Sequence, residues 1–547
     1  MEITEPITPG QLSVLLGFTP VLVWWIYAEV SNHVKEHLHR DSHRDSENNL
    51  ANVDVGTISE DAEVHLLAGG RSLASSSKDR QQVSPNIVSC CWTRRISLEN
   101  QLTTLRAMSE FGSFLIYFYI CYCTDLFGEF KLVYNRDIFL FLYILFIMFA
   151  STTSSKVEHE DTPVAGKSIL YLNRNQTEEW KGWMQVLFVM FHYFEAAEIL
   201  NIIRTFVAAY VWMTGFGNFS YYYVRKDFSI VRFCQMMWRI NFLVAFCGIL
   251  LHKPYVDYYI CPMHTFFTLM VYGFLGFMNQ YNDLGSVIAA KIFACFLVIV
   301  LIYEVPGVFD VVWSPFEFLL GSGYNPSMDE WRYRSGLDRY IWIVGMIYAY
   351  YHPTVERWLQ KLEETGTKLR VSIKAAIVTV CLVVAYLWYE YVCKLDDDTY
   401  SKYHPYTSWI PISIYICLRN ITQQFRSCTL TLLVWLGKIT LETYILQFCM
   451  LLSWHGMARN IVLSLIPNYP MVNLILTTAI YVTVSHRIFL LTNKLKLAFL
   501  PTGDNVRLVR NIMSAAVISL SLYALSWLLL HLSKMLAASQ SSLPVQV

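Results

Sequence analysis

The chain has 547 residues, of which 55% are hydrophobic, 15% aromatic and 15% charged, and its 42 Lys and Arg balance 42 Asp and Glu. Soluble domains carry about 25% charged residues, so this composition excludes a set of soluble domains and predicts a protein that crosses a membrane many times. The charge balance excludes the basic surface typical of nucleic-acid binding. The 13 Cys are scattered, mostly in apolar runs, so neither a disulfide framework nor a metal site is expected.

The N-terminal region is expected to hold one membrane helix followed by a polar segment. Residues 1–29 contain an apolar run with no basic region before it and no small-residue cleavage site after it, which predicts a retained first helix. Residues 30–105 are rich in Ser, Asp, Glu, His and Arg and poor in aromatics. This composition predicts a disordered polar loop.

Residues 106–535 form a succession of apolar runs, followed by a short tail at 536–547. A helix needs about 20 residues to cross a bilayer core of roughly 30 Å, and an open sheet edge cannot lie in lipid. We therefore predict an all-α, polytopic membrane helix bundle with roughly 11–14 spans, counting the N-terminal helix. The expected later spans are 109–127, 137–153, 183–203, 205–224, 234–251, 260–278, 287–305, 339–352, 373–393, 409–425, 429–452, 472–491 and 511–534.

Polar residues interrupt the expected span 183–203, where His192, Glu195 and Arg204 stand in an apolar context. Ionisable groups at bilayer depth cost roughly 2.5–3.5 kcal/mol on insertion scales, so they tend to line protected cavities. In a continuous helix Glu195 would be a neighbour of His192. A carboxylate there would fix the imidazole tautomer and strengthen it as a base. The alternative is a buried His that only supports helix packing, and the residues alone leave both open.

A second polar group occupies residues 212–228. Gly215 and Gly217 are expected to break the helix, and Arg225 and Lys226 to mark an aqueous surface. A broken helix beside cations suits a phosphate-bearing ligand. An ordinary loop with positive flanks is an equally good interpretation.

Two further groups have the spacing of salt bridges on a helix. Arg334 precedes Asp338 by one turn, with Arg339 beside it, and Lys438 precedes Glu442 in the same way. The excess of Arg in the first group also suits phosphate groups, whereas a buried Lys–Glu pair is usually structural. The familiar soluble catalytic patterns, including GxSxG, HExxH and the Walker loop, are absent from the sequence.

His404 stands immediately before Pro405, which favours an extended backbone at a helix boundary. Around it lies one of several long strings that together carry a family resemblance. These strings are YLNRNQTEEWKGWMQ, VAAYVWMTGFGNFSYYY, LDRYIW, YHPYTSWIPI, LRNITQQFRS and WLGKITLETYILQF.

From Pro6 to Pro501 the chain resembles the plant Reduced Wall Acetylation proteins. More remotely it is similar to the fungal capsule O-acetylation protein and to the membrane part of animal sialate O-acetyltransferase. The resemblance implies a membrane-bound acyltransferase of the Golgi apparatus that takes part in O-acetylation of cell-wall polysaccharides such as xylan. It also implies acetyl-CoA as the donor substrate, with no permanently bound cofactor.

The resemblance also assigns roles to single residues. His192 matches a membrane His that relatives share, and His404 lies in another matching motif, so both are expected to be catalytic. Glu195 is carried over more weakly, because the animal relative does not share it. Relatives usually have a His where Cys449 stands here, and His455 can substitute for it only in part.

The expected mechanism places the phosphates of acetyl-CoA on Arg and Lys side chains within residues 225–239 or 332–339. His192 would deprotonate the acceptor hydroxyl or carry the acetyl group transiently. Arg204, Arg239 or Asn241 would stabilise the developing oxyanion. The residues expected to bind the donor are Arg204, Arg225, Lys226, Arg239, Asn241, Arg334, Asp338, Arg339 and Lys438.

Two alternatives to acetyl transfer stay open at this stage. One is a Golgi transporter of acetyl-CoA or acetyl groups that supplies separate lumenal acetyltransferases. This alternative is favoured by the expectation that the chain lacks the lumenal hydrolase-like domain of its animal and fungal relatives. The other is a scaffold for those enzymes. The expected partners are acetyl-CoA, a polysaccharide or intermediate acceptor, lumenal wall acetyltransferases and membrane lipid, and no nucleic acid is expected.

Overall fold

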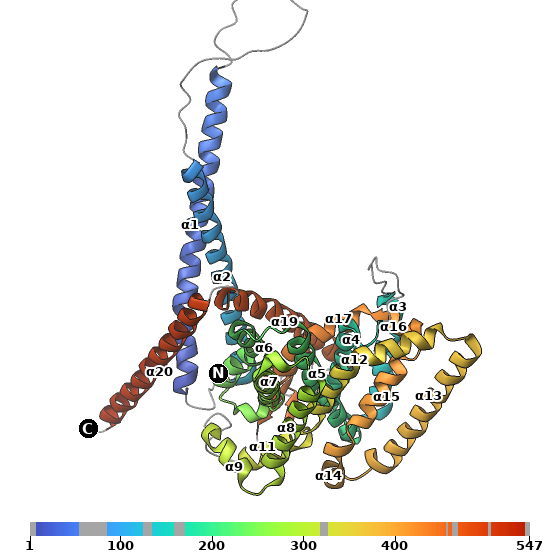
Figure 1. Ribbon diagram of the computed structural model, residues 1–547. Coiled ribbons are helices and arrows are strands. Elements are labelled where there is room, and N and C mark those ends of the chain that lie inside the picture. The colour runs from blue at the N-terminus through green and yellow to red at the C-terminus, as the bar shows by residue number, and fades with distance from the viewer. Residues whose placement is uncertain are drawn as a thin grey trace, which may run out of the picture. The chain divides into compact units, whose positions relative to one another are not determined.

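The computed structural model describes residues 7–53, 85–123, 134–157, 170–317, 327–455, 458–461, 466, 469–501 and 505–541 (Figure 1). Side chains are described throughout these ranges except at 35–53, 85–100, 123, 327, 451–461 and 537–541. The helices of the described chain are α1 (Pro9–Val53), α2 (Pro85–Cys123), α3 (Arg136–Ser154), α4 (Arg174–Phe194), η2 (Ala197–Ile199), α5 (Leu200–Arg225), α6 (Ile230–Leu250), η3 (Tyr255–Tyr258), α7 (Ile260–Gly276), η4 (Asn279–Tyr281), α8 (Gly285–Glu304), α9 (Val308–Trp313), η5 (Ser314–Phe316), α11 (Ser327–Leu337), α12 (Ile341–Glu364), α13 (Thr367–Trp388), η6 (Tyr389–Cys393), α14 (Asp397–Thr407), α15 (Trp409–Asn420), α16 (Gln423–Ser427), α17 (Thr431–Lys438), α18 (Thr440–Leu446), η7 (Gln447–Leu451), α19 (Pro470–Phe499) and α20 (Asn505–Ser541).

Strands are short and occur in two antiparallel pairs within the described residues. β1 (Ser155–Val157) pairs with β2 (Cys428–Leu430), and β3 (Leu452–His455) pairs with β4 (Ala458–Ile461). The first pair joins segments that lie far apart in the sequence, next to the ends of α3 and α16. The remainder of the regular structure is helical, as the composition predicts.

The chain divides into two units, residues 1–14 with 113–547, and residues 15–112. The described part of the smaller unit consists of most of α1 and α2, which lie antiparallel (Figure 1). Gly112 permits close packing, because a Cβ at this position would lie 1.9 Å from the ring of Phe18. Arg106 forms an ion pair with Glu29 further along the two helices. Helical structure therefore extends well into the segment 30–105 that composition predicted to be a disordered loop, although 54–84 lies outside the described residues.

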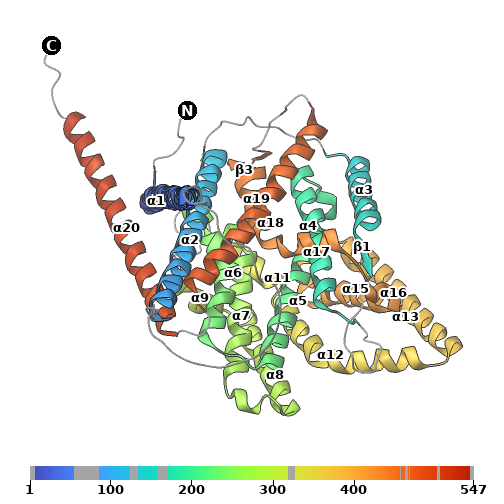
Figure 2. The ribbon, with the colours of Figure 1, turned by 90° about the horizontal axis from the view of Figure 1, so that it is seen from above.

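The centre of the larger unit consists of two helix pairs in backbone contact. α5 packs against α12, and α4 packs against α17 (Figure 2). A Cβ on Gly215 of α5 would lie 1.9 Å from the carbonyl oxygen of Trp342, and a Cβ on Gly345 of α12 would lie 2.3 Å from that of Trp212. Small residues let membrane helices approach in this way.

The second helix pair, α4 and α17, also has a glycine on each helix at the point of closest contact. A Cβ on Gly182 of α4 would lie 2.0 Å from the carbonyl oxygen of Leu433, and one on Gly437 of α17 would lie 1.9 Å from that of Glu178. The prediction that Gly215 and its neighbour Gly217 break a helix was wrong, since α5 runs through both without interruption. The glycine at 215 serves close helix approach instead.

Eight described helices are long and apolar enough to cross a membrane, or nine if the bent pair α17 and α18 forms one span. The all-α, polytopic membrane fold is confirmed, but this number falls below the predicted 11–14. Some apolar runs form helices that are too short, such as α7 with 17 residues and α15 with 12. The eight candidate spans are Pro9–Val34, Arg136–Ser154, Ala197–Arg225, Ile230–Leu250, Gly285–Glu304, Thr367–Cys393, Pro470–Phe499 and Asn505–Leu536.

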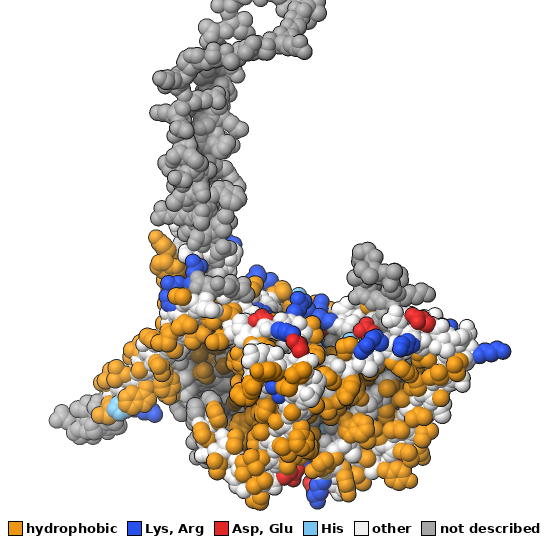
Figure 3. Space-filling model, viewed as in Figure 1, with side chains coloured by type: hydrophobic (Ala, Val, Ile, Leu, Met, Phe, Trp, Pro, Cys, Tyr) orange, Lys and Arg blue, Asp and Glu red, His pale blue; other side chains and the backbone are white. Residues whose placement is uncertain are grey.

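The surface of the larger unit agrees with a lipid environment. On the face shown in Figure 3, hydrophobic side chains cover most of this unit, and many Lys, Arg, Asp and Glu side chains gather along its upper edge. Large apolar side chains are exposed on several candidate spans, including Phe141 of α3, Phe293 of α8 and Val383 of α13. Apolar exposure on this scale marks an interaction surface, and hydrocarbon suits helices of this length.

Candidate active site

His192 lies in the last turn of α4, inside a collar of aromatic rings. Its ring centroid is 4.7 Å from that of Phe188 and 4.9 Å from that of Phe191, both on the same helix. Phe448 of η7 adds a third ring at 5.9 Å. The side chain is half-buried. Because the carbonyl end of a helix carries partial negative charge, this position stabilises a positive charge on the imidazole.

The end of α4 is set by Glu195, which occupies the C-cap position in the left-handed conformation at φ 51°. Its backbone N–H donates to the carbonyl oxygen of Phe191, and its side chain is exposed. The predicted contact between Glu195 and His192 assumed an unbroken helix over 183–203. That assumption was wrong, because α4 ends at Phe194 and the chain restarts as η2 and α5.

The π-helical segment η7 supplies the other wall of the aromatic collar. The ring of Phe448 also packs against Tyr258 at 5.8 Å and Tyr444 at 5.6 Å. Cys449, where the resemblance led us to expect a His, is fully buried, and its Sγ donates to the carbonyl oxygen of Ile445 at 3.5 Å. This position therefore holds a packed thiol, while the side chain of His455 lies outside the described residues.

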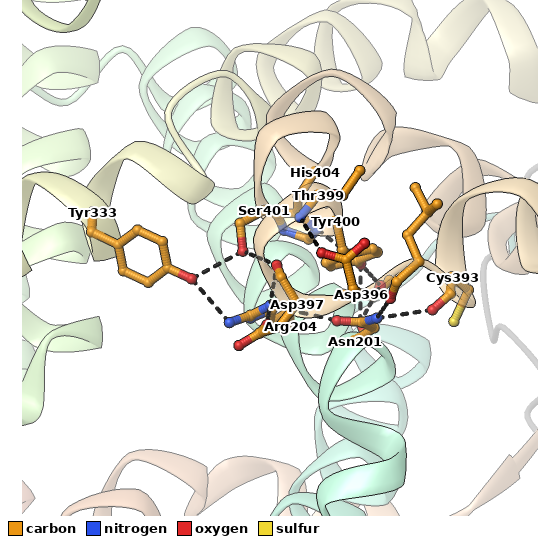
Figure 4. Close-up of polar contacts among 12 residues, drawn as sticks. Asn201, Arg204, Tyr333, Cys393, Asp396, Asp397, Thr399, Tyr400, Ser401 and His404 are labelled. Atoms are coloured by element: carbon orange, nitrogen blue, oxygen red, sulfur yellow. Dashed lines mark hydrogen bonds and ion pairs between the residues drawn. The ribbon is translucent and has the colours of Figure 1, made fainter.

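His404 lies in α14 and belongs to a network of polar contacts (Figure 4). Its Nδ1 is 2.9 Å from the hydroxyl of Tyr400, and its Nε2 is 3.3 Å from Oδ1 of Asp338. His404 is 1% exposed and Asp338 3%. Burial raises the pKa of Asp338, and its hydrogen bond with His404 acts in the opposite direction. Both ring nitrogens of His404 are thus engaged, which suits a positioning residue better than one that meets a substrate.

The network continues from Tyr400 to α5. The hydroxyl of Tyr400 donates to the carbonyl oxygen of Asn201 at 3.0 Å. Arg204, one turn further along α5, forms an ion pair with Asp397 and donates to the hydroxyl of Tyr333 at 3.0 Å (Figure 4). Arg204 was predicted to bind the donor, and in this structure its guanidinium instead joins α5 to α11 and α14.

Arg239 and Glu442 form the ion pair that the sequence assigned to Lys438 and Glu442. Nη2 of Arg239 donates to Oε2 of Glu442 at 2.9 Å, and the carboxylate is fully buried. The Lys438–Glu442 prediction was wrong, because α17 and α18 meet at a 60° bend around Ile439 and the two residues are not on one helix. The carbonyl oxygen of Lys438 accepts from Nη2 of Arg239 at 3.3 Å, and its side chain is exposed.

The predicted Arg334–Asp338 salt bridge was also wrong. α11 ends at Leu337, so Asp338 lies outside the helix, where it contacts His404. Arg334 forms an ion pair with Glu330 instead. Arg339 forms an ion pair with Glu304 at 2.8 Å.

The other residues predicted to bind the donor lie in separate contacts. Lys226 pairs with Asp283 at 2.7 Å on an exposed surface, and Arg225 is exposed at the end of α5. The amide of Asn241 donates to Thr265 at 2.9 Å. The nine predicted donor-binding residues therefore have different hydrogen-bond and ion-pair partners, although Arg204, Arg334 and Asp338 all lie within electrostatic reach of Tyr259.

Sequence reasoning missed two buried ion pairs because their partners are far apart along the chain. Arg419 donates to Glu179 at 3.1 Å, and the fully buried Arg426 donates to Glu363 at 2.6 Å. The available signal was a charged residue within an apolar context, which implies a partner without naming it.

Residues 44–513 match the family described as the 10 TM acyl transferase domain found in Cas1p. The Danio rerio protein named N-acetylneuraminate (7)9-O-acetyltransferase is 28% identical over 440 residues, which cover 77% of this chain and 54% of that relative. The chain thus spans about half the length of this curated relative. No solved structure matches it significantly. On the extent of the family match, the chain belongs to the 10 TM acyl transferase family of Cas1p.

Proposed function

We propose that this protein is an O-acetyltransferase that moves acetyl groups from acetyl-CoA towards sugar hydroxyls. The observation that carries the proposal is the family match over residues 44–513, supported by the name of the Danio rerio relative. The motif resemblance supports a finer assignment to the plant Reduced Wall Acetylation group. On that assignment the protein works in the Golgi membrane, and its acceptors are wall polysaccharides such as xylan or an intermediate carrier.

His192 is the residue proposed to carry the chemistry. Its half-buried ring sits among Phe188, Phe191 and Phe448 at the carbonyl end of α4. The aromatic collar limits water, and the helix end favours the imidazolium that forms when the ring takes up a proton. His192 is therefore suited to act as a general base.

The proposed reaction is balanced in protons and bonds. The imidazole of His192 removes the proton of an acceptor hydroxyl, whose oxygen attacks the carbonyl carbon of the acetyl thioester. A C–O bond forms, the C–S bond breaks, and the thiolate of CoA takes the proton from the imidazolium. The products are the acetyl ester and free CoA.

Two other residues predicted to be catalytic are proposed to have supporting roles. His404 is proposed to act through position rather than contact, because Tyr400 and Asp338 occupy both of its ring nitrogens. Glu195 is exposed beyond the end of α4 and is proposed to close that helix rather than to orient His192.

The test uses purified full-length protein in liposomes with acetyl-CoA labelled in its acetyl group and xylan oligosaccharides as acceptors. Transfer predicts labelled ester and an equal amount of free CoA. The His192→Gln variant is expected to form neither the labelled ester nor free CoA. His531→Gln on the exposed surface of α20 is the matched control and is expected to keep wild-type rates.

Folding of each variant is checked by size-exclusion profile and thermal unfolding. A folded His192→Gln protein with full transfer would remove the proposed role of this residue. Delivery of intact acetyl-CoA across the bilayer, with neither ester nor free CoA formed, would replace transfer by transport.

A further inference from the structure

Three cations gather between α6 and α19, namely Arg232 and Arg239 on α6 and Lys496 on α19. Arg232 and Arg239 are about two helical turns apart and so lie on one face of α6. The ammonium group of Lys496 on α19 lies within electrostatic reach of both guanidinium groups. All three side chains are half-buried. Like charges repel at this range, so their arrangement needs compensating negative charge.

The acids nearby compensate for only part of this charge. Glu442 is fully buried, and both of its oxygens accept from Arg239. A second acid, Asp227, interacts with Arg232. It already accepts from the hydroxyl of Tyr221 and the backbone N–H of Ser229, each at 3.0 Å. Lys496 has no acid as a hydrogen-bond partner in the described structure, where its Nζ donates to Oδ1 of Asn493 at 3.1 Å.

Both arginines are held in place by aromatic rings, and Arg232 also has a donor to spare. The guanidinium of Arg232 lies over the ring of Tyr221, 4.5 Å from its centroid, and its buried Nε has no hydrogen-bond partner among the described residues. Arg239 lies 5.0 Å from the centroid of Phe489 on α19. Stacking of this kind fixes the plane of a guanidinium and leaves its N–H groups directed outward.

Two hydrogen bonds hold the helices that carry these cations at a fixed spacing. Gln235 of α6 donates to the carbonyl oxygen of Leu500 at 3.3 Å, and Trp238 donates to that of Thr492 at 3.2 Å. The cations are thus organised before any ligand arrives, which lowers the entropic cost of binding.

We propose that Arg232, Arg239 and Lys496 form a binding site for a phosphate group. Planar guanidinium groups that are partly withdrawn from water bind phosphate through paired, charge-assisted hydrogen bonds, and an adjacent ammonium adds a point charge. The phosphate belongs either to a membrane lipid headgroup or to a nucleotide-type donor such as CoA. The site is independent of the proposed reaction at His192, because binding does not require transfer.

The experiment measures binding to the full-length protein in nanodiscs without turnover. CoA and its phosphate-free fragment pantetheine are compared by calorimetry in neutral phosphatidylcholine discs. Retention of phosphatidic acid against phosphatidylcholine is compared by native mass spectrometry. Arg232→Gln and Lys496→Gln are the test variants, because Arg239 also neutralises the buried Glu442. Lys368→Gln, an exposed cation on α13, is the matched control.

Each test variant is expected to lower the affinity for the phosphate-bearing probe by roughly 10- to 100-fold, which corresponds to losing a charge-assisted hydrogen bond. The binding of pantetheine and of phosphatidylcholine is expected to be unchanged in the test variants. Weaker binding of CoA alone identifies a donor site, and weaker binding of phosphatidic acid alone identifies a lipid site. Arg232→Lys, which keeps the charge but not the planar fork, is expected to fall between wild type and Arg232→Gln.

The proposal is overturned if folded Arg232→Gln and Lys496→Gln proteins bind every probe as the wild type does. It is also overturned if Lys368→Gln weakens the probes equally, or if the wild type prefers neither CoA over pantetheine nor phosphatidic acid over phosphatidylcholine. A protein that binds phosphate but transfers no acetyl group would leave this site standing and remove only the proposed reaction.

Discussion

Nε2 of His404 lies 3.3 Å from Oδ1 of Asp338, with both side chains buried, so α14 is joined to the turn between α11 and α12. The hydroxyl of Tyr400 donates to the carbonyl oxygen of Asn201 at 3.0 Å and lies 2.9 Å from Nδ1 of His404. His404 and Asp338 thus form a buried pair. The pair holds together the helices that position Arg204.

Removing either partner of this pair is expected to destabilise the protein. Asp338→Ala leaves a buried imidazole nitrogen without its partner, which costs about 1–3 kcal/mol. A double-mutant cycle with His404→Ala is expected to give a coupling energy of about 0.5–3 kcal/mol. The measurement is thermal or denaturant unfolding of the detergent-solubilised protein.

The control for this cycle is the exposed pair of Lys226 and Asp283, whose side chains are 58% and 70% exposed. Asp283→Ala is expected to change stability by about 0–1 kcal/mol. Strictly additive effects of the Asp338 and His404 variants would contradict the coupling.

Glycine positions give a second prediction with a control on the same helix. Gly215→Ala on α5 would place a Cβ 1.9 Å from the backbone of Trp342, so the two helices must separate. Such overpacking costs about 1–3 kcal/mol. Gly217→Ala meets no atom within 4 Å and gains up to about 1 kcal/mol of helix propensity. The unfolding free energies of the two variants are expected to shift in opposite directions from the wild-type value. Equal shifts would contradict the packing interpretation.

The two glycines also show what the sequence could and could not predict. Apolar runs of span length predict α5, α6 and α8, because period and length are local properties of the chain. Whether a glycine breaks a helix or lets another approach depends on the partner helix. That partner, α12, begins more than a hundred residues after α5 ends, so no local pattern reveals the contact.

The same limit applies to the candidate site. Spacing on a helix correctly drew attention to the polar residues, but it paired them with near neighbours. Glu442 was assigned to Lys438, and its partner is Arg239 of another helix. Asp338 was assigned to Arg334, and its partner is His404. Helix ends decide these cases, because one residue outside a helix is enough to remove an i,i+4 contact.

The Arg239–Glu442 pair is expected to be asymmetric. Arg239→Gln leaves the fully buried Glu442 carboxylate uncompensated and is expected to cost about 3–5 kcal/mol. Glu442→Gln is expected to cost less, because the side chain of Arg239 is 29% exposed and can reach water. Unfolding measurements on both variants test which one loses more stability, with the exposed Lys361→Gln as a neutral control. A larger loss for Glu442→Gln would contradict the proposed asymmetry.

Glu363 gives a prediction about pH. Burial alone would raise the pKa of Glu363, but hydrogen bonds from Lys374 and Arg426 outweigh it and lower the pKa below its ordinary value of 4.5. A carboxylate with a lowered folded-state pKa stabilises the protein fully above the unfolded-state value, and this contribution is lost as the pH falls through the folded-state value.

Glu363→Gln is therefore expected to cost about 1–3 kcal/mol near pH 7, where it removes an ionic partner of the buried Arg426. The difference in unfolding free energy between wild type and variant is expected to stay constant down to about pH 4.5 and to shrink below it, because protonated Glu363 resembles Gln. Glu364→Gln, the exposed neighbour on α12, is expected to show no such pH dependence. If the Glu363→Gln difference instead grew as the solution was acidified, the carboxylate would not be held ionised by Lys374 and Arg426.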